Sequence, residues 1–170
     1  MNPNTTYDKS QMTFLPVSLN VTGKKILLVG GGRFASHKIG FIEQFTKNIT
    51  VVAIDVIDTI KQKGIRFTEK AYEKSDLEEY FLVYACTNIK ELNQRVKDDA
   101  ESLGILCNVV DNPVLCDFVS PAIYKNGHYT VAVGSNAQDV YKSIEIRDRI
   151  KEYLTNDPTV FSQPSKKPAH

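Results

Sequence analysis

The strongest indication of the fold comes from residues 25–35, Lys25-Ile26-Leu27-Leu28-Val29-Gly30-Gly31-Gly32-Arg33-Phe34-Ala35. In this stretch a short apolar run ends in glycines and continues into a segment compatible with a helix. Gly30, Gly32 and Ala35 have the G-x-G-x-x-A spacing of a dinucleotide-binding turn, which joins a buried strand to a helix. The first glycine permits the tight turn, the second lets the backbone approach a pyrophosphate, and the small third residue lets the helix pack closely. The helix N-terminus would offer N–H groups and partial positive charge to the phosphates.

The context of this turn favours a nucleotide site over a purely structural glycine turn. A second apolar strand is predicted at 49–54, and Asp55 follows it, twenty residues beyond Ala35. Asp55 is a candidate partner for the adenosine ribose hydroxyls, and its charge would repel a 2′-phosphate, which favours NAD over NADP. The alternative is that Asp55 caps a helix or belongs to a loop.

Strands and helices alternate along the chain as far as Asp111. This alternation predicts a Rossmann-like, doubly wound parallel sheet of the α/β class. Beyond Asp111 the pattern changes and predicts a small hairpin followed by one helix. The predicted elements are strands at 25–29, 49–54, 65–68, 81–85 and 106–110, helices at 35–45, 58–63 and 92–103, a helical turn at 76–80, hairpin strands at 118–124 and 129–133, and a final helix at 140–154.

The element order also predicts how the chain is organised. We expect a flexible N-terminal arm at 1–13 and an NAD-binding Rossmann domain at 14–113. A dimerisation and substrate region is expected at 114–156, since a hairpin and one helix have little core of their own. The segment 157–170 holds three prolines and few apolar residues, so a disordered tail is expected there.

Composition argues against several classes of function. The chain has 170 residues, with 21 Lys and Arg against 20 Asp and Glu, so its net charge of +1 gives no global reason to bind nucleic acid or a membrane surface. No apolar run approaches the length of about 18 residues that a membrane span needs. The polar N-terminus does not resemble a secretory signal, and we expect a cytoplasmic protein.

The cysteines and histidines do not form a metal-binding pattern. Cys86, Cys107 and Cys116 are odd in number and lack a C-x-x-C spacing, which argues against a disulfide framework and a zinc site. Cys86 and Cys107 fall in predicted strands, where a free cysteine behaves as a small hydrophobic residue. His37 and His128 have no second ligand at a suitable spacing and are interpreted as surface residues, so no metal site is expected.

Candidate site residues follow the strands, because ligands of open α/β sheets bind at the carboxyl ends of the strands. Asp111, after the fifth predicted strand, is the candidate acid/base, since a carboxylate beside a nicotinamide can accept a proton as hydride leaves. The alternative is that Asp111-Asn112-Pro113 is simply a turn. The residues expected to bind the cofactor are Gly30, Gly31, Gly32, Arg33, Phe34, Ala35, Ile54, Asp55, Cys86 and Thr87.

Several motifs in order resemble the precorrin-2 dehydrogenase/sirohydrochlorin ferrochelatase family, which forms the N-terminal domain of siroheme synthases. The resemblance covers about residues 13–154 and is strongest around Cys107–Asp111 and Phe118–Ala122. Its motifs are Phe14-Leu15-Pro16-Val17, Val29–Ala35 with Lys38, Ala85-Cys86-Thr87-Asn88, Leu92-Asn93-Gln94-Arg95-Val96, Cys107-Asn108-Val109-Val110-Asp111 and Phe118-Val119-Ser120-Pro121-Ala122.

This resemblance implies NAD-dependent oxidation of precorrin-2 to sirohydrochlorin by a homodimer, with insertion of ferrous iron as a further step in some members. It places the family's key aspartate on Asp111. It places NAD contacts on Arg33, Phe34, Ile54 and Asp55. The residues expected to contact the tetrapyrrole are Asn108, Ser120, Pro121 and Ser135.

The chain also departs from the family pattern. His37 replaces an arginine before Lys38, and residues 134–143 replace a Ser/Gly-rich stretch that borders the tetrapyrrole site. Iron insertion is therefore left open, as are the metal and the choice between siroheme and cobalamin-type pathways. The alternatives are a chelatase without the redox step and a non-catalytic module that binds NAD or a tetrapyrrole.

Overall fold

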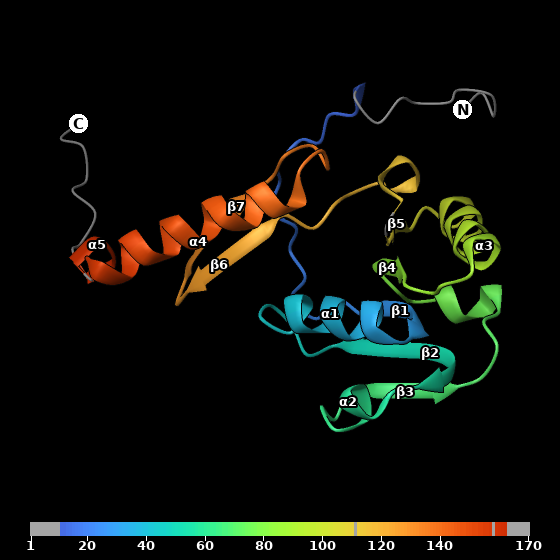
Figure 1. Ribbon diagram of the computed structural model, residues 1–170. Helices are drawn as coiled ribbons and strands as arrows, with labels where there is room; N and C mark the ends of the chain where they lie inside the picture. The colour runs from blue at the N-terminus through green and yellow to red at the C-terminus, as the bar shows by residue number, and fades with distance from the viewer. Residues whose placement is uncertain (1–10, 111, 158, 163–170) are drawn as a thin grey trace, which may run out of the picture. The chain divides into compact units, whose positions relative to one another are not determined.

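The computed structural model describes residues 11–110, 112–157 and 159–162. These residues form two compact units, which divide between Val119 and Ser120. The first unit carries the glycine turn and a parallel sheet, and the second carries a hairpin and a long helix (Figure 1). None of the described helices combines the length and apolar character needed to cross a membrane.

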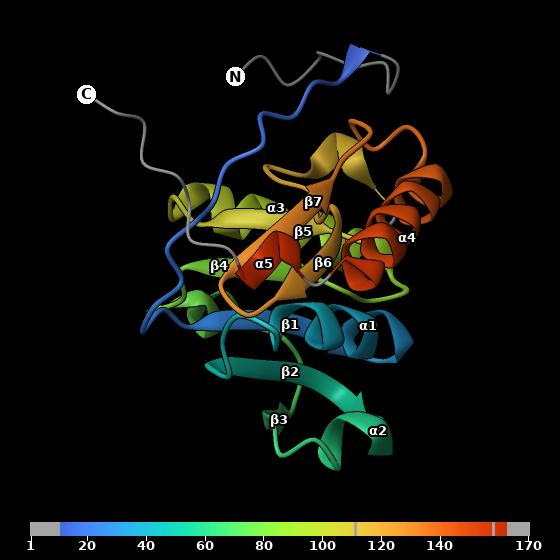
Figure 2. The same ribbon diagram turned by 90° about the vertical axis from the view of Figure 1, so that its left-hand side faces the viewer.

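The sheet of the first unit has five strands in the order β3-β2-β1-β4-β5, and all neighbouring pairs are parallel (Figure 2). The central strand β1 is buried on both faces, which explains why its sequence is almost continuously apolar. The predicted Rossmann-like fold is therefore confirmed. The strands are β1 (Ile26–Gly31), β2 (Ile49–Val56), β3 (Arg66–Glu69), β4 (Leu82–Ala85) and β5 (Leu106–Val109).

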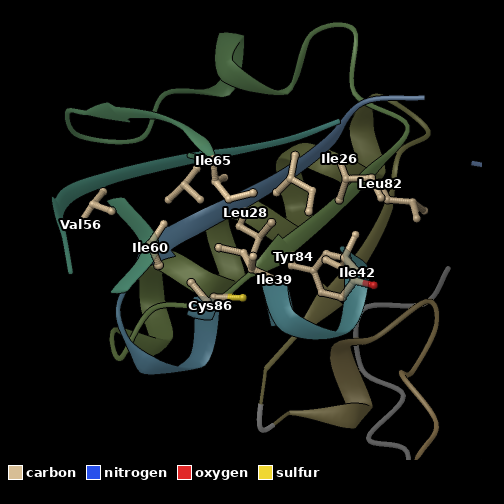
Figure 3. Close-up of a cluster of buried hydrophobic side chains, with 13 residues drawn as sticks. Ile26, Leu28, Ile39, Ile42, Val56, Ile60, Ile65, Leu82, Tyr84 and Cys86 are labelled. Carbon is tan, nitrogen blue, oxygen red and sulfur yellow. The ribbon is translucent and has the colours of Figure 1, made fainter. Parts of the chain in front are cut away.

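Helices pack on both faces of this sheet. Helices α1 (Arg33–Ile42) and α2 (Asp58–Lys61) contribute Ile39 and Ile60 to one core (Figure 3), while α3 (Lys90–Ser102) contributes Val96 to the core on the other face. A 3₁₀ turn, η2 (Lys74–Leu77), lies where a helical turn was predicted at 76–80. Helix α1 begins at Arg33 rather than Ala35, directly after the glycines.

The segment after β5 belongs to the first unit, which differs from the strand predicted at 118–124. The Phe118 ring packs edge-on against Tyr84 of β4 at 5.3 Å between centroids. The Phe118 carbonyl also accepts a hydrogen bond from Asn108 Nδ2 at 2.8 Å. These contacts hold Phe118 on the parallel sheet, so the hairpin strand β6 (Ala122–Asn126) begins only after Pro121. A short 3₁₀ turn, η3 (Pro113–Leu115), lies between β5 and β6 in the chain.

An ion pair anchors the end of this segment. The Lys97 ammonium on α3 pairs with Asp117, whose Oδ2 also accepts the backbone N–H of Cys107 at 2.9 Å. The Lys97 side chain is only 11% exposed and that of Asp117 is 30% exposed. The pair therefore ties α3 and β5 to the loop that leads out of the first unit.

We expect Lys97→Met to lower the free energy of unfolding by about 1–3 kcal/mol, because it leaves the partly buried Asp117 carboxylate without its counter-charge. Urea unfolding measures the change. The control is Arg149→Met, which breaks the exposed pair between Arg149 and Glu145 and should cost less than about 0.5 kcal/mol. Equal losses in the two variants would contradict the role given to Lys97.

The second unit consists of the antiparallel hairpin of β6 and β7 (Tyr129–Val133) and helix α4 (Val140–Asn156). Gly127, with a φ of +55°, makes the tight turn of the predicted hairpin. Arg147 Nη1 of α4 donates to the Ile123 carbonyl of β6 at 3.1 Å. On the exposed side of α4, Arg149 Nη2 pairs with Glu145 Oε1 at 2.7 Å.

The chain ends differ in part from the prediction. A disordered tail was predicted at 157–170, but Thr159–Ser162 forms a short helix, α5, whose start is capped by Asp157 Oδ1 accepting from the Thr159 N–H at 3.1 Å. Residues 158 and 163–170 lie outside the described part of the chain. The same holds for residues 1–10 of the predicted arm.

Candidate functional site

The glycine turn lies at the carboxyl end of β1. Gly30 has a φ of +116°, and a Cβ there would lie 2.6 Å from the Cys86 carbonyl oxygen that follows β4. Both the backbone conformation and the close approach of β4 therefore require glycine.

Gly31 is required for a different reason. A Cβ at this position would lie 2.2 Å from the Asp55 carbonyl oxygen of β2. The Gly31 carbonyl also accepts the Ile57 N–H at 3.0 Å. The G-x-G-x-x-A pattern leaves this middle position free, so spacing alone does not reveal that the contact with β2 demands glycine.

Gly32 stands at the N-terminus of α1, and no atom lies within 4 Å of where its Cβ would be. No side chain caps this helix end, and its first turn contains no acidic residue. Ala35, fully buried, holds the start of α1 against the sheet. This open, uncapped helix end fits the pyrophosphate of a dinucleotide, because helix N-terminal N–H groups bind phosphate oxygens.

A pocket of about 430 Å³ lies beside the glycine turn, between α1 and the start of α2. Its described lining residues are Arg33, Ser36, His37, Ile57, Asp58 and Thr59. Three predicted cofactor contacts are exposed nearby: Phe34 in the first turn of α1, and Ile54 and Asp55 close to the end of β2, with Ile54 exposed to 76%. They are not among the described residues that line the pocket.

The end of β4 is held by a buried asparagine that the site prediction missed. Asn93 Oδ1 of α3 accepts hydrogen bonds from the Thr87 N–H at 3.1 Å and from the Thr87 hydroxyl at 2.7 Å. Asn93 Nδ2 donates back to the Thr87 carbonyl at 2.9 Å. Thr87 is thus fixed at the sheet edge by α3. The sequence signal that could have identified Asn93 was a polar residue on the otherwise apolar face of a predicted amphipathic helix.

The three cysteines are free thiols. Burial raises the pKa of Cys107 to about 12 and also raises the pKa of Cys116. Cys86, predicted to contact the cofactor, is 2% exposed and contributes to the core on the α1 face (Figure 3). Its backbone, rather than its side chain, reaches the glycine turn.

The loop after β5 is built around Asn108 and Cys116. Asn108 is 4% exposed, and its Nδ2 bonds with Phe118 while its Oδ1 has no described partner. Cys116 Sγ accepts the Val109 N–H at 3.2 Å. Asn108 therefore orders this loop from within, instead of presenting an exposed side chain to a substrate. Asp111, the candidate acid/base, lies outside the described residues.

The remaining predicted substrate contacts, Ser120, Pro121 and Ser135, belong to the second unit. The Ser135 hydroxyl accepts the Asp139 N–H at 3.0 Å and donates to the Asp139 carbonyl at 2.9 Å. Asp139 in turn caps α4 by accepting the Lys142 N–H at 2.7 Å. Ser135 therefore braces the loop that starts α4.

Among the described residues, no three His, Cys, Asp or Glu side chains gather in a way that could hold a metal ion. The charged residues that the site prediction missed are Asp58 in the pocket and the Lys97–Asp117 pair. Nothing in their local sequence pattern distinguishes them from ordinary surface charges.

Comparison with known proteins agrees with this geometry. The sequence model of a family described as "Putative NAD(P)-binding" matches residues 17–122. The siroheme synthase of Baumannia cicadellinicola is 33% identical over 147 residues, which cover 84% of this chain and 32% of that protein. The siroheme synthase of Methylococcus capsulatus is 35% identical over 144 residues, covering 82% of this chain and 30% of that protein. The chain thus spans about a third of the length of these curated relatives.

A solved structure shares the fold. The protein titled "SirC, precorrin-2 dehydrogenase" superposes with a TM-score of 0.69 and 23% sequence identity, covering 91% of this chain and 84% of that one.

Proposed function

Because the chain belongs to this NAD(P)-binding family, we propose that it uses NAD to oxidise precorrin-2 to sirohydrochlorin in siroheme biosynthesis. The observation that carries the proposal is the 33% identity to a siroheme synthase across 84% of the chain. The open helix end at Gly32 supports it independently, because it supplies the phosphate cradle that the cofactor needs.

In this proposal, the residues at the ends of the strands bind different parts of the cofactor. Gly32 and the first N–H groups of α1 hold the pyrophosphate. Arg33, Phe34 and Ile54 surround the adenosine half, and the Asp55 carbonyl packs against the glycine turn. Gly30 and Thr87 bring the ends of β1 and β4 close to each other, and Cys86 supplies backbone there. Bound NAD would accept a hydride from a macrocycle carbon.

Asp111 is the group proposed to take the proton that leaves with the hydride. The assignment is supported by its position in the sequence, shortly after β5, because ligands of open α/β sheets bind at the carboxyl ends of the strands. Ser120, Pro121 and Ser135 are proposed to contact the tetrapyrrole. For Asn108 the burial supports an indirect part, since it orders the loop between β5 and Phe118.

The proposal is tested with purified protein and precorrin-2, followed by the absorption spectrum of sirohydrochlorin with and without NAD. NAD-dependent formation of sirohydrochlorin supports it. A second reaction, with sirohydrochlorin and ferrous iron, tests iron insertion, which we keep within the proposal. Iron insertion without NAD-dependent oxidation would instead identify a chelatase, and NAD binding without either reaction would identify a non-catalytic module.

We also propose that the region 114–156 forms a homodimer, in the cytoplasm. Exposed apolar side chains on α4 support this, with Val140 at 60%, Tyr141 at 87% and Tyr153 at 68% exposed. Within α4, only Ser143 is buried. A two-stranded hairpin is also marginally stable without further packing.

We expect light scattering at micromolar concentration to give the mass of a dimer. Tyr141→Asp, which places a charge on an apolar contact surface, should shift the protein toward monomer. Lys151→Asp, an exposed substitution on the same helix, should leave the dimer intact. A monomeric wild-type protein would contradict this part of the proposal.

A further inference from the structure

The pocket beside the glycine turn has a cation on one wall and an acid on the other. Arg33 comes from the first turn of α1, and Asp58 comes from the first turn of α2. Among the described residues, neither side chain forms an ion pair. Two opposite charges that share a pocket without pairing leave room for a polar ligand between them.

We propose that Asp58, rather than Asp55, is the residue that selects NAD over NADP. The inference rests on the proposed function only in taking this edge of the sheet as the cofactor site. Where β2 ends in a dinucleotide-binding fold, an acid hydrogen-bonds the adenosine 2′-hydroxyl, whereas an arginine accommodates a 2′-phosphate. Asp58 lines the pocket at this place, and Asp55 does not.

The charges around the pocket explain why a single acidic residue can determine whether NAD or NADP binds more tightly. Arg33 on the α1 wall would attract a 2′-phosphate, and Asp58 is the acid among the described lining residues. Lys61 is committed to Glu69 at 2.7 Å, an interaction that raises the pKa of Lys61, with smaller contributions in the same direction from Asp55 and Asp58. Removing the Asp58 charge therefore leaves the Arg33 guanidinium without an opposing carboxylate among the described lining residues.

The backbone of Asp55 has another task. Its carbonyl packs against Gly31, at 2.2 Å from where a Cβ would lie. This contact positions β2 beside the glycine turn, and the side chain is not needed for it. The Asp55 carbonyl therefore packs against the glycine turn. The Asp58 carboxylate, just after β2, distinguishes NAD from NADP in this proposal.

Calorimetric titration with two probes that differ only in the 2′-phosphate, 5′-AMP and 2′,5′-ADP, tests the inference without any turnover. The wild-type protein is expected to bind 5′-AMP at least tenfold more tightly than 2′,5′-ADP. Asp58→Asn should reduce this ratio at least tenfold or invert it. Asp55→Asn, the matched control, should keep the wild-type ratio. NAD and NADP should follow the same order.

Two further variants test whether the change in the binding ratio comes from the Asp58 charge. Asp58→Ser also removes the charge, so it replaces Asp58→Asn if circular dichroism shows that Asp58→Asn is misfolded. Arg33→Gln, added to Asp58→Asn, should abolish the gain in 2′,5′-ADP binding.

The inference is overturned if Asp55→Asn relaxes the ratio and Asp58→Asn does not, if the wild-type protein does not discriminate between the probes, or if neither probe binds. Failure of precorrin-2 oxidation with the expected probe binding would remove the proposed reaction and leave the inference standing.

Discussion

Asp111→Ala is expected to lower the rate of NAD-dependent precorrin-2 oxidation by about 10²–10⁴-fold, the usual loss when a general acid/base is removed. NAD affinity and the dimer should remain unchanged, because Asp111 follows β5 in the sequence while the proposed phosphate site follows β1. Spectroscopic assay of sirohydrochlorin formation under single-turnover conditions measures the rate, and calorimetry measures NAD affinity.

Asp111→Asn separates charge from shape at this position. It should be nearly as slow as Asp111→Ala if the carboxylate takes the proton. Asn112→Ala is the matched control, since Asn112 is exposed and its side chain has no proposed part in the reaction. If iron insertion occurs, it should also fall in Asp111→Ala, because displacing the inner pyrrole protons needs a base. Near-full turnover in Asp111→Ala would reduce Asp111 to a turn residue.

Gly32→Val is expected to weaken NAD binding by about 100-fold or more, which corresponds to about 3 kcal/mol. The protein should still fold, because Gly32 has an extended backbone with φ of −92° and its Cβ position is open. The valine side chain would instead occupy the space where the pyrophosphate approaches the helix end. Calorimetry with NAD and far-UV circular dichroism measure the two outcomes.

Gly31→Ala is the matched control for this glycine turn. Its Cβ would collide with the Asp55 carbonyl oxygen, so this smaller change should lower the free energy of unfolding by about 3 kcal/mol or more. Gly32→Val should leave the unfolding midpoint in urea nearly unchanged. Normal NAD binding by a folded Gly32→Val protein would show that the cofactor lies elsewhere.

Local pattern predicted the parallel sheet because β1, β2, β4 and β5 are short and mainly apolar, and segments with helical periodicity lie between strands. β1 and β2 are buried runs that could be recognised without tertiary information, and the glycines after β1 mark the turn. The start of β6 was predicted too early. Phe118 has the apolar character of a strand residue, but its ring is held by Tyr84 from β4, a contact that residues distant in sequence create.

The candidate site divides in the same way. Gly30, Gly32 and Ala35 were identified by spacing, since the turn that they form is local. The demand for glycine at Gly31, the clamp of Asn93 on Thr87 and the position of Asp58 in the pocket depend on contacts between separate elements. No spacing rule within one segment encodes such contacts.

The parallel fold, the glycine turn and the hairpin with its following helix could be predicted from local sequence, because hydrophobic periodicity and turn conformation are properties of neighbouring residues. Which glycine faces open space, which polar side chains are buried and which charges share a pocket became visible only in the folded chain. Asp58 and Arg33, for example, line one pocket only because β2, α1 and α2 come together in space, and steric contacts between these elements depend on the same packing.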